Sequence, residues 1–356
     1  MPSFPPRSAL LLVSFGGPEG PADVEPFLRN VTHGRNVPAE RLAQVAGHYE
    51  RFGGVSPINE QNRNLLAALR NEFAADLPVY WGNRHWHPFL AEALGAMAAD
   101  GVTVGYAFFT SAYNSYSGCR QYREDLARAR AAVGADAPTI VRLRQFHNHP
   151  GFVAPMAERV REALHSFAPS RREAARLVFV AHSLPLAQAA ASGPRGGAYQ
   201  HQLEVTAGLV AERLDGSPAW QLAYCSRSGP GSVPWLEPDV LDCLDVLAAE
   251  GVREVVLAPI GFVSDHLEVV YDLDVEAAER AAGLGLDLRR ARTVGTDPAF
   301  VAMVRELAEE HLDPDRPRRA LGSDGPGHAV CPPGCCLPAG QTELPAVSGA
   351  IGNRQA

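Results

Sequence analysis

Eight short apolar runs, separated by longer segments with helical spacing, are the feature that most constrains how this chain folds. The runs are rich in β-branched and aromatic residues, which favours β-strands. They begin at Ala9, Leu77, Gly101, Thr139, Arg176, Ala219, Arg253 and Leu286. Strands that alternate with helices form βαβ units, in which neighbouring strands run parallel.

The eight runs divide into four and four around the segment between His147 and Phe167. A chain of 356 residues is also long for a single core. We therefore expect an α/β protein of two Rossmann-like domains, each a four-stranded parallel sheet flanked by helices. The expected domains cover residues 7–150 and 151–312, and a Pro- and Gly-rich tail covers residues 313–356. Ligands of such folds bind at the carboxyl ends of the strands, so we expect a site there, in a cleft between the domains.

Composition excludes several classes of function. The formal net charge is −8 and no basic stripe occurs, which argues against a nucleic-acid partner. The longest apolar run near the start, ALLLV, is too short for a transmembrane segment or a secretory signal. We therefore expect a cytoplasmic protein without a transmembrane segment. Its six cysteines then suggest metal binding rather than disulfides.

The run after Arg253 leads into FVSDHLEVVYDLD, which holds a histidine and four carboxylates. In a regular helix, four acids of this region would share one face at i, i+3, i+7 and i+11: Asp265, Glu268, Asp272 and Glu276. A solvated acidic face is the ordinary explanation. However, no basic residue between Arg253 and Arg280 relieves the repulsion. A cation site is the alternative, because divalent ions favour oxygen and imidazole ligands.

Two other loops follow expected strands and carry residues with useful chemistry. His182 ends the strand in VFVAHSLP, where a histidine is either a hydrogen-bonded structural residue or a functional one. Trp235 lies in the long loop YCSRSGPGSVPWLEPDV, where it either covers a helix or offers a flat face to a flat ligand. The glycines of SFGGPEG do not match a dinucleotide fingerprint, and we interpret them as a tight turn.

The tail would be disordered if nothing held it, yet it contains three cysteines within six residues, CPPGCC. Zinc and an iron–sulfur cluster both explain Cys331, Cys335 and Cys336, and each needs a fourth ligand from elsewhere. Cys243 fits the core of an amphipathic helix, whereas Cys119 lies on a loop after a strand and is the freer candidate. The spacing alone does not decide between the two metals.

Six segments, taken together and in this order, resemble the ferrochelatase family: LLVSFGGPEG, RFGGVSPINEQNRNLL, YWGNRHWHPF, VAHSLP, SRSGPGSVPWLEP and PIGFVSDHLEVVYDLDVE. The likeness runs from about Ala9 to about Pro314 and is strongest to the actinobacterial coproporphyrin III ferrochelatases. It implies the two-domain chelatase fold and an enzyme that inserts ferrous iron into coproporphyrin III, giving Fe-coproporphyrin III in haem biosynthesis. An alternative is that the substrate is protoporphyrin IX. A different class of function is a non-catalytic haem or iron carrier.

The resemblance also implies roles for individual residues. His182 and Glu268 match the catalytic histidine and glutamate, and both are expected to contact iron. Asp272 and Glu276 match the acids of the family's proposed metal path. Five residues match positions that hold the porphyrin: Arg35, Tyr49, Ser56, Tyr122 and Trp235. Glu19 stands where some relatives carry a tyrosine that ligates the product iron, so that ligand does not carry over.

Many members of the family hold a [2Fe–2S] cluster with one internal cysteine and three near the C-terminus. The resemblance therefore implies Cys119, Cys331, Cys335 and Cys336 as cluster ligands. Such a cluster would also order the tail, because metal binding supplies folding free energy. The expected partners are coproporphyrin III and Fe²⁺, with a decarboxylase of the haem pathway expected downstream.

Overall fold

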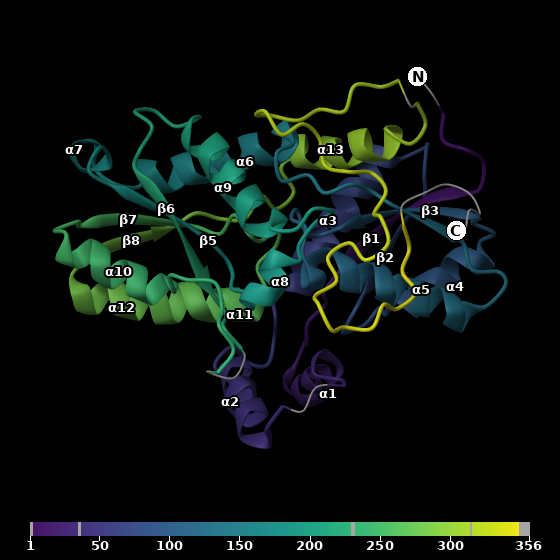
Figure 1. Ribbon diagram of the computed structural model, residues 1–356, viewed down its shortest axis with the longest axis horizontal. Coiled ribbons are helices and arrows are strands. Elements are labelled where there is room, and N and C mark those ends of the chain that lie inside the picture. Colours follow the sequence, from purple (N-terminus) through teal and green to yellow (C-terminus); the bar gives the residue numbers. More distant parts are fainter. Residues whose placement is uncertain (1–2, 35–36, 229–231, 314, 349–356) are drawn as a thin grey trace.

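The computed structural model describes residues 3–34, 37–228, 232–313 and 315–348 of the chain. Within them, eight strands form two four-stranded parallel sheets, which confirms the predicted fold class (Figure 1). The first sheet has the order β2-β1-β3-β4, with bounds β1 (Ser8–Ser14), β2 (Val79–Asn83), β3 (Val104–Phe109) and β4 (Thr139–Arg142). The second has the order β6-β5-β7-β8, with bounds β5 (Arg176–His182), β6 (Trp220–Cys225), β7 (Glu254–Ala258) and β8 (Asp287–Arg290). The two sheets thus share one topology.

Helices connect the strands and cover both faces of each sheet, which is why the central strands are apolar throughout. Figure 1 shows α10 (Val240–Ala249) and α12 (Ala277–Leu284) on one face of the second sheet, with α6 (Pro150–His165) and α9 (Ala198–Ala211) on the other. The remaining α-helices are α1 (Pro21–Val31), α2 (Ala39–Glu50), α3 (Ile58–Phe73), α4 (Leu90–Ala99), α5 (Gln121–Val133), α7 (Pro169–Arg172), α8 (Leu186–Ala190), α11 (Leu267–Val270) and α13 (Pro298–Glu309). Two π-helical segments complete the set, η1 (Tyr116–Arg120) and η2 (Tyr271–Glu276).

The largest hydrophobic core contains residues of both sheets. Helix α13 follows the second sheet in the sequence but also packs on the first half of the chain. The Phe300 ring lies edge-on to Phe108 of β3, with centroids 6.0 Å apart, and Arg305 Nε lies 2.9 Å from Glu72 Oε1 on α3. The domain boundary expected near residue 150 therefore stays a prediction, because packing continues across it.

Helices α1 and α2 form a small lobe outside the two sheets (Figure 1). Its own core contains Val24, Phe27, Leu28 and Tyr49, and these pack against Leu267 at the start of α11. The lobe is therefore fixed to the acidic stretch that follows β7.

The tail contains neither helix nor strand over its described residues, yet it runs across the first sheet and its helices (Figure 1). Buried arginines of the first half of the chain donate hydrogen bonds to its backbone carbonyls. The donor–acceptor pairs are Arg120 Nη2 to Leu344 O (2.9 Å), Arg123 Nε to Val347 O (2.5 Å), Arg142 Nη2 to His328 O (2.8 Å) and Arg144 Nη2 to Arg319 O (2.9 Å). These hydrogen bonds anchor the tail to the rest of the protein independently of any bound metal.

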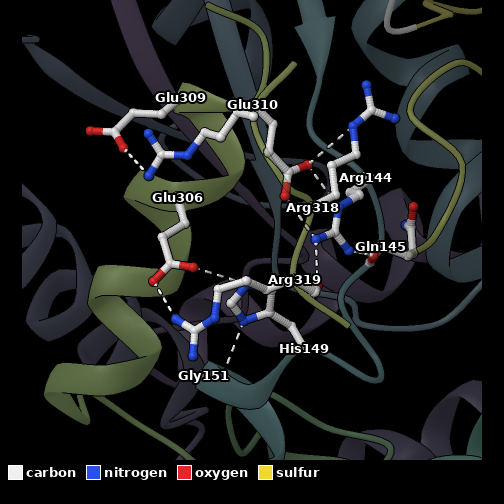
Figure 2. A network of polar contacts seen from close by, with 10 residues as sticks. Arg144, Gln145, His149, Gly151, Glu306, Glu309, Glu310, Arg318 and Arg319 are labelled. Carbon is white, nitrogen blue, oxygen red and sulfur yellow. Dashed lines mark hydrogen bonds and ion pairs between the residues drawn. The ribbon is translucent and has the colours of Figure 1, made fainter. Parts of the chain in front are cut away.

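A buried ion pair ties the segment after β4 to the end of α13 (Figure 2). Arg144, which follows β4, donates to both carboxylate oxygens of Glu310 at 2.7 and 2.8 Å, and the two side chains are 1% and 4% exposed. Arg319 in turn lies 2.8 Å from Glu306 of α13. Among the described residues, no helix combines the length and the apolar character that crossing a membrane requires.

Candidate functional site

His182 is the last residue of β5, at the carboxyl edge of the second sheet, where the sequence predicts a site. Its Nδ1 atom lies 2.5 Å from the Ser183 carbonyl oxygen. Because a carbonyl only accepts, Nδ1 carries the proton and Nε2 keeps a lone pair in the neutral ring. Burial lowers the pKa of His182, which favours the neutral form, although the Ser183 carbonyl and Asp272 act in the opposite direction. His182 can therefore accept a proton or bind a metal through Nε2.

Glu268 faces His182 from α11, in the loop-and-helix segment that follows β7. Glu268 Oε2 lies 3.8 Å from His182 Nε2, and the two side chains are 44% and 32% exposed, so a substrate can contact both. The predicted cleft itself stays a prediction. One pocket of about 360 Å³ lies between α12 and β8. Another, of about 470 Å³, is lined by Arg7 and Gly101 among other residues.

Helix α11 continues without a break into the π-helix η2 and then into α12. A π-helix bonds residue i to i+5 and so has more residues per turn than an α-helix. Acids spaced four apart therefore stay on one side of this segment: Glu268, Asp272 and Glu276. The apolar residues between them, Val269 and Leu273, are buried at 0% and 1% exposure. Three of the four acids that the sequence places on one helix face therefore do lie on one side of this segment.

The fourth predicted member, Asp265, lies outside the helix and was wrongly placed on the row. Helix α11 begins at Leu267, and Arg290 Nη2 of β8 donates to Asp265 Oδ1 at 2.9 Å. The same guanidinium lies 2.7 Å from Asp274 Oδ1 through its Nε atom. Arg290 therefore pairs with both Asp265 and Asp274.

The three acids of the row have raised pKa values, and so does Asp274. Burial raises the pKa of Glu268 to about 7, while Arg41 acts in the opposite direction. Because 44% of the Glu268 side chain is exposed, water screens part of this effect. Burial and the neighbouring Glu268 raise the pKa of Asp272 to about 7, and burial also raises that of Glu276. Such groups exchange protons and metal ions near neutral pH.

The loop after β6 packs directly on the His182 loop. Ser183 Oγ donates to the Leu236 carbonyl at 2.9 Å, and the Leu236 amide donates to the Leu184 carbonyl at 2.9 Å. Trp235 is thereby held beside Pro185. Its Nε1–H is buried and has no partner among the described residues, which leaves a donor for a ligand. In the same loop, Ser226 Oγ donates to Asp272 Oδ2.

The α1–α2 lobe brings two predicted substrate residues to the acidic segment. Tyr49 is 8% exposed and lies close enough to Glu268 for that carboxylate, together with burial, to raise its pKa. Ser56 Oγ accepts a hydrogen bond from the Leu267 amide at 3.2 Å, so it supports the start of α11. The His48 ring stacks on Tyr271 of η2, with centroids 3.8 Å apart, and fixes α2 over the π-helix.

Two other residues singled out by the sequence have partners of their own. Tyr122 is buried on α5, where the Arg84 guanidinium lies 4.5 Å from the centre of its ring. Glu19 forms an ion pair with Arg63, with Glu19 Oε1 2.6 Å from Arg63 Nη2. Arg35 lies outside the described residues.

Four cysteines form a separate buried cluster, as the resemblance implied: Cys119, Cys331, Cys335 and Cys336, at 0%, 4%, 3% and 1% exposure. All four are free thiols, and the Sγ atoms of Cys335 and Cys336 lie 3.8 Å apart. Hydrogen bonds from Cys119 and Cys335, with Arg142 nearby, lower the pKa of Cys331, which favours the metal-binding thiolate. We call these four residues the cysteine pocket. Four converging thiols, one of them favoured as thiolate, fit a metal or a cluster.

His328 also borders the cysteine pocket. Its Nε2 atom lies 3.4 Å from Cys331 Sγ, and the ligand atoms of His328, Cys331 and Cys335 all fall within 4.8 Å of one another. Sequence reasoning missed His328, although its position three residues before Cys331 was a usable signal. It also missed Ser226 and Arg290, for which no local signal exists because each pairs with an acid far along the chain.

Comparisons with known proteins agree with this arrangement. A coproporphyrin III ferrochelatase of Frankia alni is 58% identical over 341 residues, which span 94% of this chain and 87% of the relative. One from Streptomyces griseus is 53% identical over 364 residues, or 97% of this chain and 96% of the relative. Among solved structures, SirB from Bacillus subtilis with Fe³⁺ shares the fold, with a TM-score of 0.54 at 12% identity over 85% of this chain and 96% of SirB. The family model described as Ferrochelatase matches residues 7–312, and the chain therefore belongs to the ferrochelatase family.

Proposed function

We propose that this chain is an enzyme that inserts Fe²⁺ into coproporphyrin III and forms Fe-coproporphyrin III in haem biosynthesis. The relatives of more than 50% identity that carry this name support the substrate. The observation that carries the chemistry is the pair formed by His182 Nε2 and Glu268 Oε2, 3.8 Å apart at the carboxyl edge of the second sheet.

The reaction replaces two pyrrole N–H protons with one Fe²⁺ ion, so two protons leave for each metal that enters. His182 is suited to accept a proton, because Nδ1 is bonded to Ser183 and Nε2 is free. Glu268, with a pKa of about 7, can take a proton or bind the metal before it enters the ring. These two residues are the proposed catalytic residues.

Asp272 and Glu276 are the proposed path for the metal to Glu268. They follow Glu268 on one side of the π-helix, and neither forms an ion pair among the described residues. Carboxylates spaced along such a row can replace the water ligands of Fe²⁺ one at a time. Arg290 supports this use of the row, because it pairs with Asp265 and Asp274 and not with Asp272 or Glu276.

Tyr49, Ser56 and Trp235 are the proposed contacts of the porphyrin. Trp235 offers a flat apolar face and an unpartnered N–H. Tyr49 and Ser56 stand where the lobe meets the acidic segment. Arg35 and Tyr122 stay sequence predictions, the first outside the described residues and the second stacked under Arg84.

Anaerobic iron insertion tests the function. The purified protein is mixed with Fe²⁺ and either coproporphyrin III or protoporphyrin IX, and loss of the free-base visible bands is followed. We expect turnover with coproporphyrin III in preference. A preference for protoporphyrin IX would show that the proposed substrate is wrong. Binding of a porphyrin without turnover of either one would indicate a carrier.

Matched substitutions assign the chemistry to the site. Glu268→Gln and His182→Ala are expected to reduce turnover by at least about 100-fold, as loss of a general acid–base group does. Glu279→Gln, the same chemical change on the same helical segment in an exposed ion pair with Arg51, is the control and should retain activity. Near-normal turnover in both site variants would contradict the assignment.

We further propose that the cysteine pocket holds a [2Fe–2S] cluster. Four buried thiols match the four ligands that such a cluster needs. When bound, the cluster would supply one-electron chemistry and additional cross-linking of the tail. Zinc bound by three cysteines and His328 is the competing assignment, because those donors also converge.

The colour and the iron and sulfide content of the protein purified without air distinguish the two metals. A cluster absorbs visible light and contains two irons and two sulfides per chain, whereas a zinc site is colourless. Cys336→Ser should abolish the signal, and Cys243→Ser, which alters a buried thiol of α10, should not. A cytoplasmic location and a downstream decarboxylase of the haem pathway stay predictions from the sequence.

A further inference from the structure

The first turn of α9 contacts the loop that carries His182. Tyr199, the second residue of this helix, is 6% exposed. Its hydroxyl donates a hydrogen bond to the His182 carbonyl oxygen at 2.9 Å. The bond fixes the peptide group that joins His182 to Ser183, and the Ser183 carbonyl in turn holds the Nδ1 atom of the imidazole. The orientation of Nε2 therefore depends on Tyr199, which does not touch Glu268 in any described contact.

The same turn is fastened to the cysteine pocket on its other side. The Tyr199 amide donates to Ser192 Oγ at 2.7 Å, and Ser192 is fully buried. The next residue, Gly193, donates its amide to Cys336 Sγ at 3.0 Å. Gly193 has a φ of +78°, and a Cβ there would lie 2.5 Å from Ala198 Cβ, so only glycine permits this close turn. Three hydrogen bonds thus lead from Cys336 to the backbone of His182.

A second connection joins α9 to Cys119. Gln202, one turn after Tyr199, accepts from the Asn114 amide and donates to Asn114 Oδ1, both at 2.8 Å. Asn114 Nδ2 lies 4.0 Å from Cys119 Sγ. Two cysteines that are far apart in the sequence, Cys119 and Cys336, therefore approach one helical turn, and that turn contacts the His182 loop.

We propose that Tyr199 is a positioning residue for His182, and that it links the position of His182 to the occupancy of the cysteine pocket. A metal or cluster in the pocket fixes the sulfur atoms of Cys336 and Cys119. The two sulfur atoms in turn hold Gly193 and Asn114. Both residues thereby keep the first turn of α9 against the His182 loop. The inference rests on the proposed function for its effect on turnover, but the link between pocket and loop is measurable without turnover.

Tyr199→Phe tests the positioning role, because it removes the hydroxyl and keeps the ring. We expect kcat for iron insertion to fall about 5- to 10-fold with KM for the porphyrin unchanged, as loss of one hydrogen bond implies. Hydrogen exchange of a peptide covering residues 180–186 should accelerate by a similar factor. Tyr106→Phe, at a buried tyrosine of the first sheet, is the matched control and should change neither quantity. Unchanged exchange in Tyr199→Phe would overturn the proposal.

Removal of the metal by a chelator, in the full-length protein, tests the link to the pocket. In the wild type, exchange of residues 180–186 should accelerate on metal removal. In Tyr199→Phe, removal should add little, because coupled groups are not additive. In Ser192→Ala, which breaks the connection but keeps the Tyr199 hydroxyl, the response to metal removal should be lost. Additive effects, no response in the wild type, or a pocket that binds no metal would each overturn the link.

The two failures are distinguishable. If the wild type does not insert iron, the proposed function fails, while the exchange measurements still decide the role of Tyr199. If iron insertion is normal and neither Tyr199→Phe nor metal removal changes the hydrogen-exchange rate of the His182 loop, only the proposed role of Tyr199 fails.

Discussion

His182 Nε2 and Glu268 Oε2 face each other across 3.8 Å, although the two residues follow different strands of the second sheet. This distance exceeds that of an N–H···O hydrogen bond, so the two groups are not hydrogen-bonded to each other. His182 is held through Nδ1 by Ser183, and Glu268 starts a row of acids along a π-helix. A base with a free lone pair thus lies opposite a carboxyl group that changes its charge near neutral pH.

Iron insertion should depend on pH through these acids. Glu268 and Asp272 have raised pKa values of about 7, so each is mostly protonated at pH 6 and mostly ionised at pH 8. Because only the ionised forms bind Fe²⁺ or accept a proton, kcat/KM for Fe²⁺ should rise about tenfold from pH 6 to pH 8. Anaerobic rates across this range test the expectation. Asp265→Asn should keep the profile, since Asp265 is paired with Arg290 outside the acid row, and a flat wild-type profile would refute the assignment.

The unpaired acids should also lower stability at high pH. The pKa of Asp272 is about 7 in the folded state, against an ordinary value of 3.8, so the native state favours the protonated form. Stability is then highest below pH 4 with respect to this group and is lost as pH rises through 7. Asp272→Asn should increase the free energy of unfolding by about 1 to 2 kcal/mol at pH 8. Urea unfolding at pH 8 and pH 5 checks this, with a gain at pH 5 as large as at pH 8 counting against it.

The sequence predicted the eight strands and the loops of His182 and Glu268 because parallel sheets place all such loops at one edge. Local pattern could not place Asp265, because the start of α11 and the partner Arg290 decide its position. Nor did it indicate how the tail is held. Arg120 ends η1 and Arg123 lies on α5, and both are buried against tail carbonyls more than 200 residues away in the sequence. Long-range pairing of this kind leaves no periodic signal.

Trp235 should matter for porphyrin binding more than for the chemical step. Trp235→Phe keeps an aromatic face but removes the buried Nε1–H that has no partner among the described residues. We expect KM for the porphyrin to rise about 5- to 10-fold with a smaller change in kcat, as loss of one hydrogen bond to the substrate implies. Trp220→Phe, at the 38% exposed tryptophan of β6, is the control. A fall in kcat at constant KM would instead place Trp235 in the reaction itself.

Arg142 should be needed to keep the proposed metal or cluster in the cysteine pocket. Its guanidinium is fully buried and donates to the carbonyls of His328 and Ala329, at 2.8 and 3.1 Å, directly before Cys331. Arg142→Met leaves both carbonyls unsatisfied, so the tail should be cleaved faster in limited proteolysis and the metal content should fall. Arg130→Met, which removes a contact with the Pro138 carbonyl away from the tail, should do neither. Full metal content in Arg142→Met would show that the cysteines hold the tail without help.

The ion pair between Arg144 and Glu310 should matter strongly for stability, because it is the most deeply buried ion pair among the described residues. The side chains are 1% and 4% exposed, and Arg144 also donates to the Arg319 carbonyl where the tail begins (Figure 2). Glu310→Gln leaves a buried guanidinium without a charged partner, which destabilises proteins by about 3 to 5 kcal/mol. Glu25→Gln, in the exposed pair with Arg29, should cost less than about 1 kcal/mol.

Urea unfolding of both variants, followed by circular dichroism, measures this difference. The Arg144→Met, Glu310→Leu double variant should recover much of the loss, since no buried charge remains, although the Arg319 carbonyl loses its donor. If Glu310→Gln were no more destabilising than Glu25→Gln, the pair would contribute to the position of the tail but not to the stability of the fold.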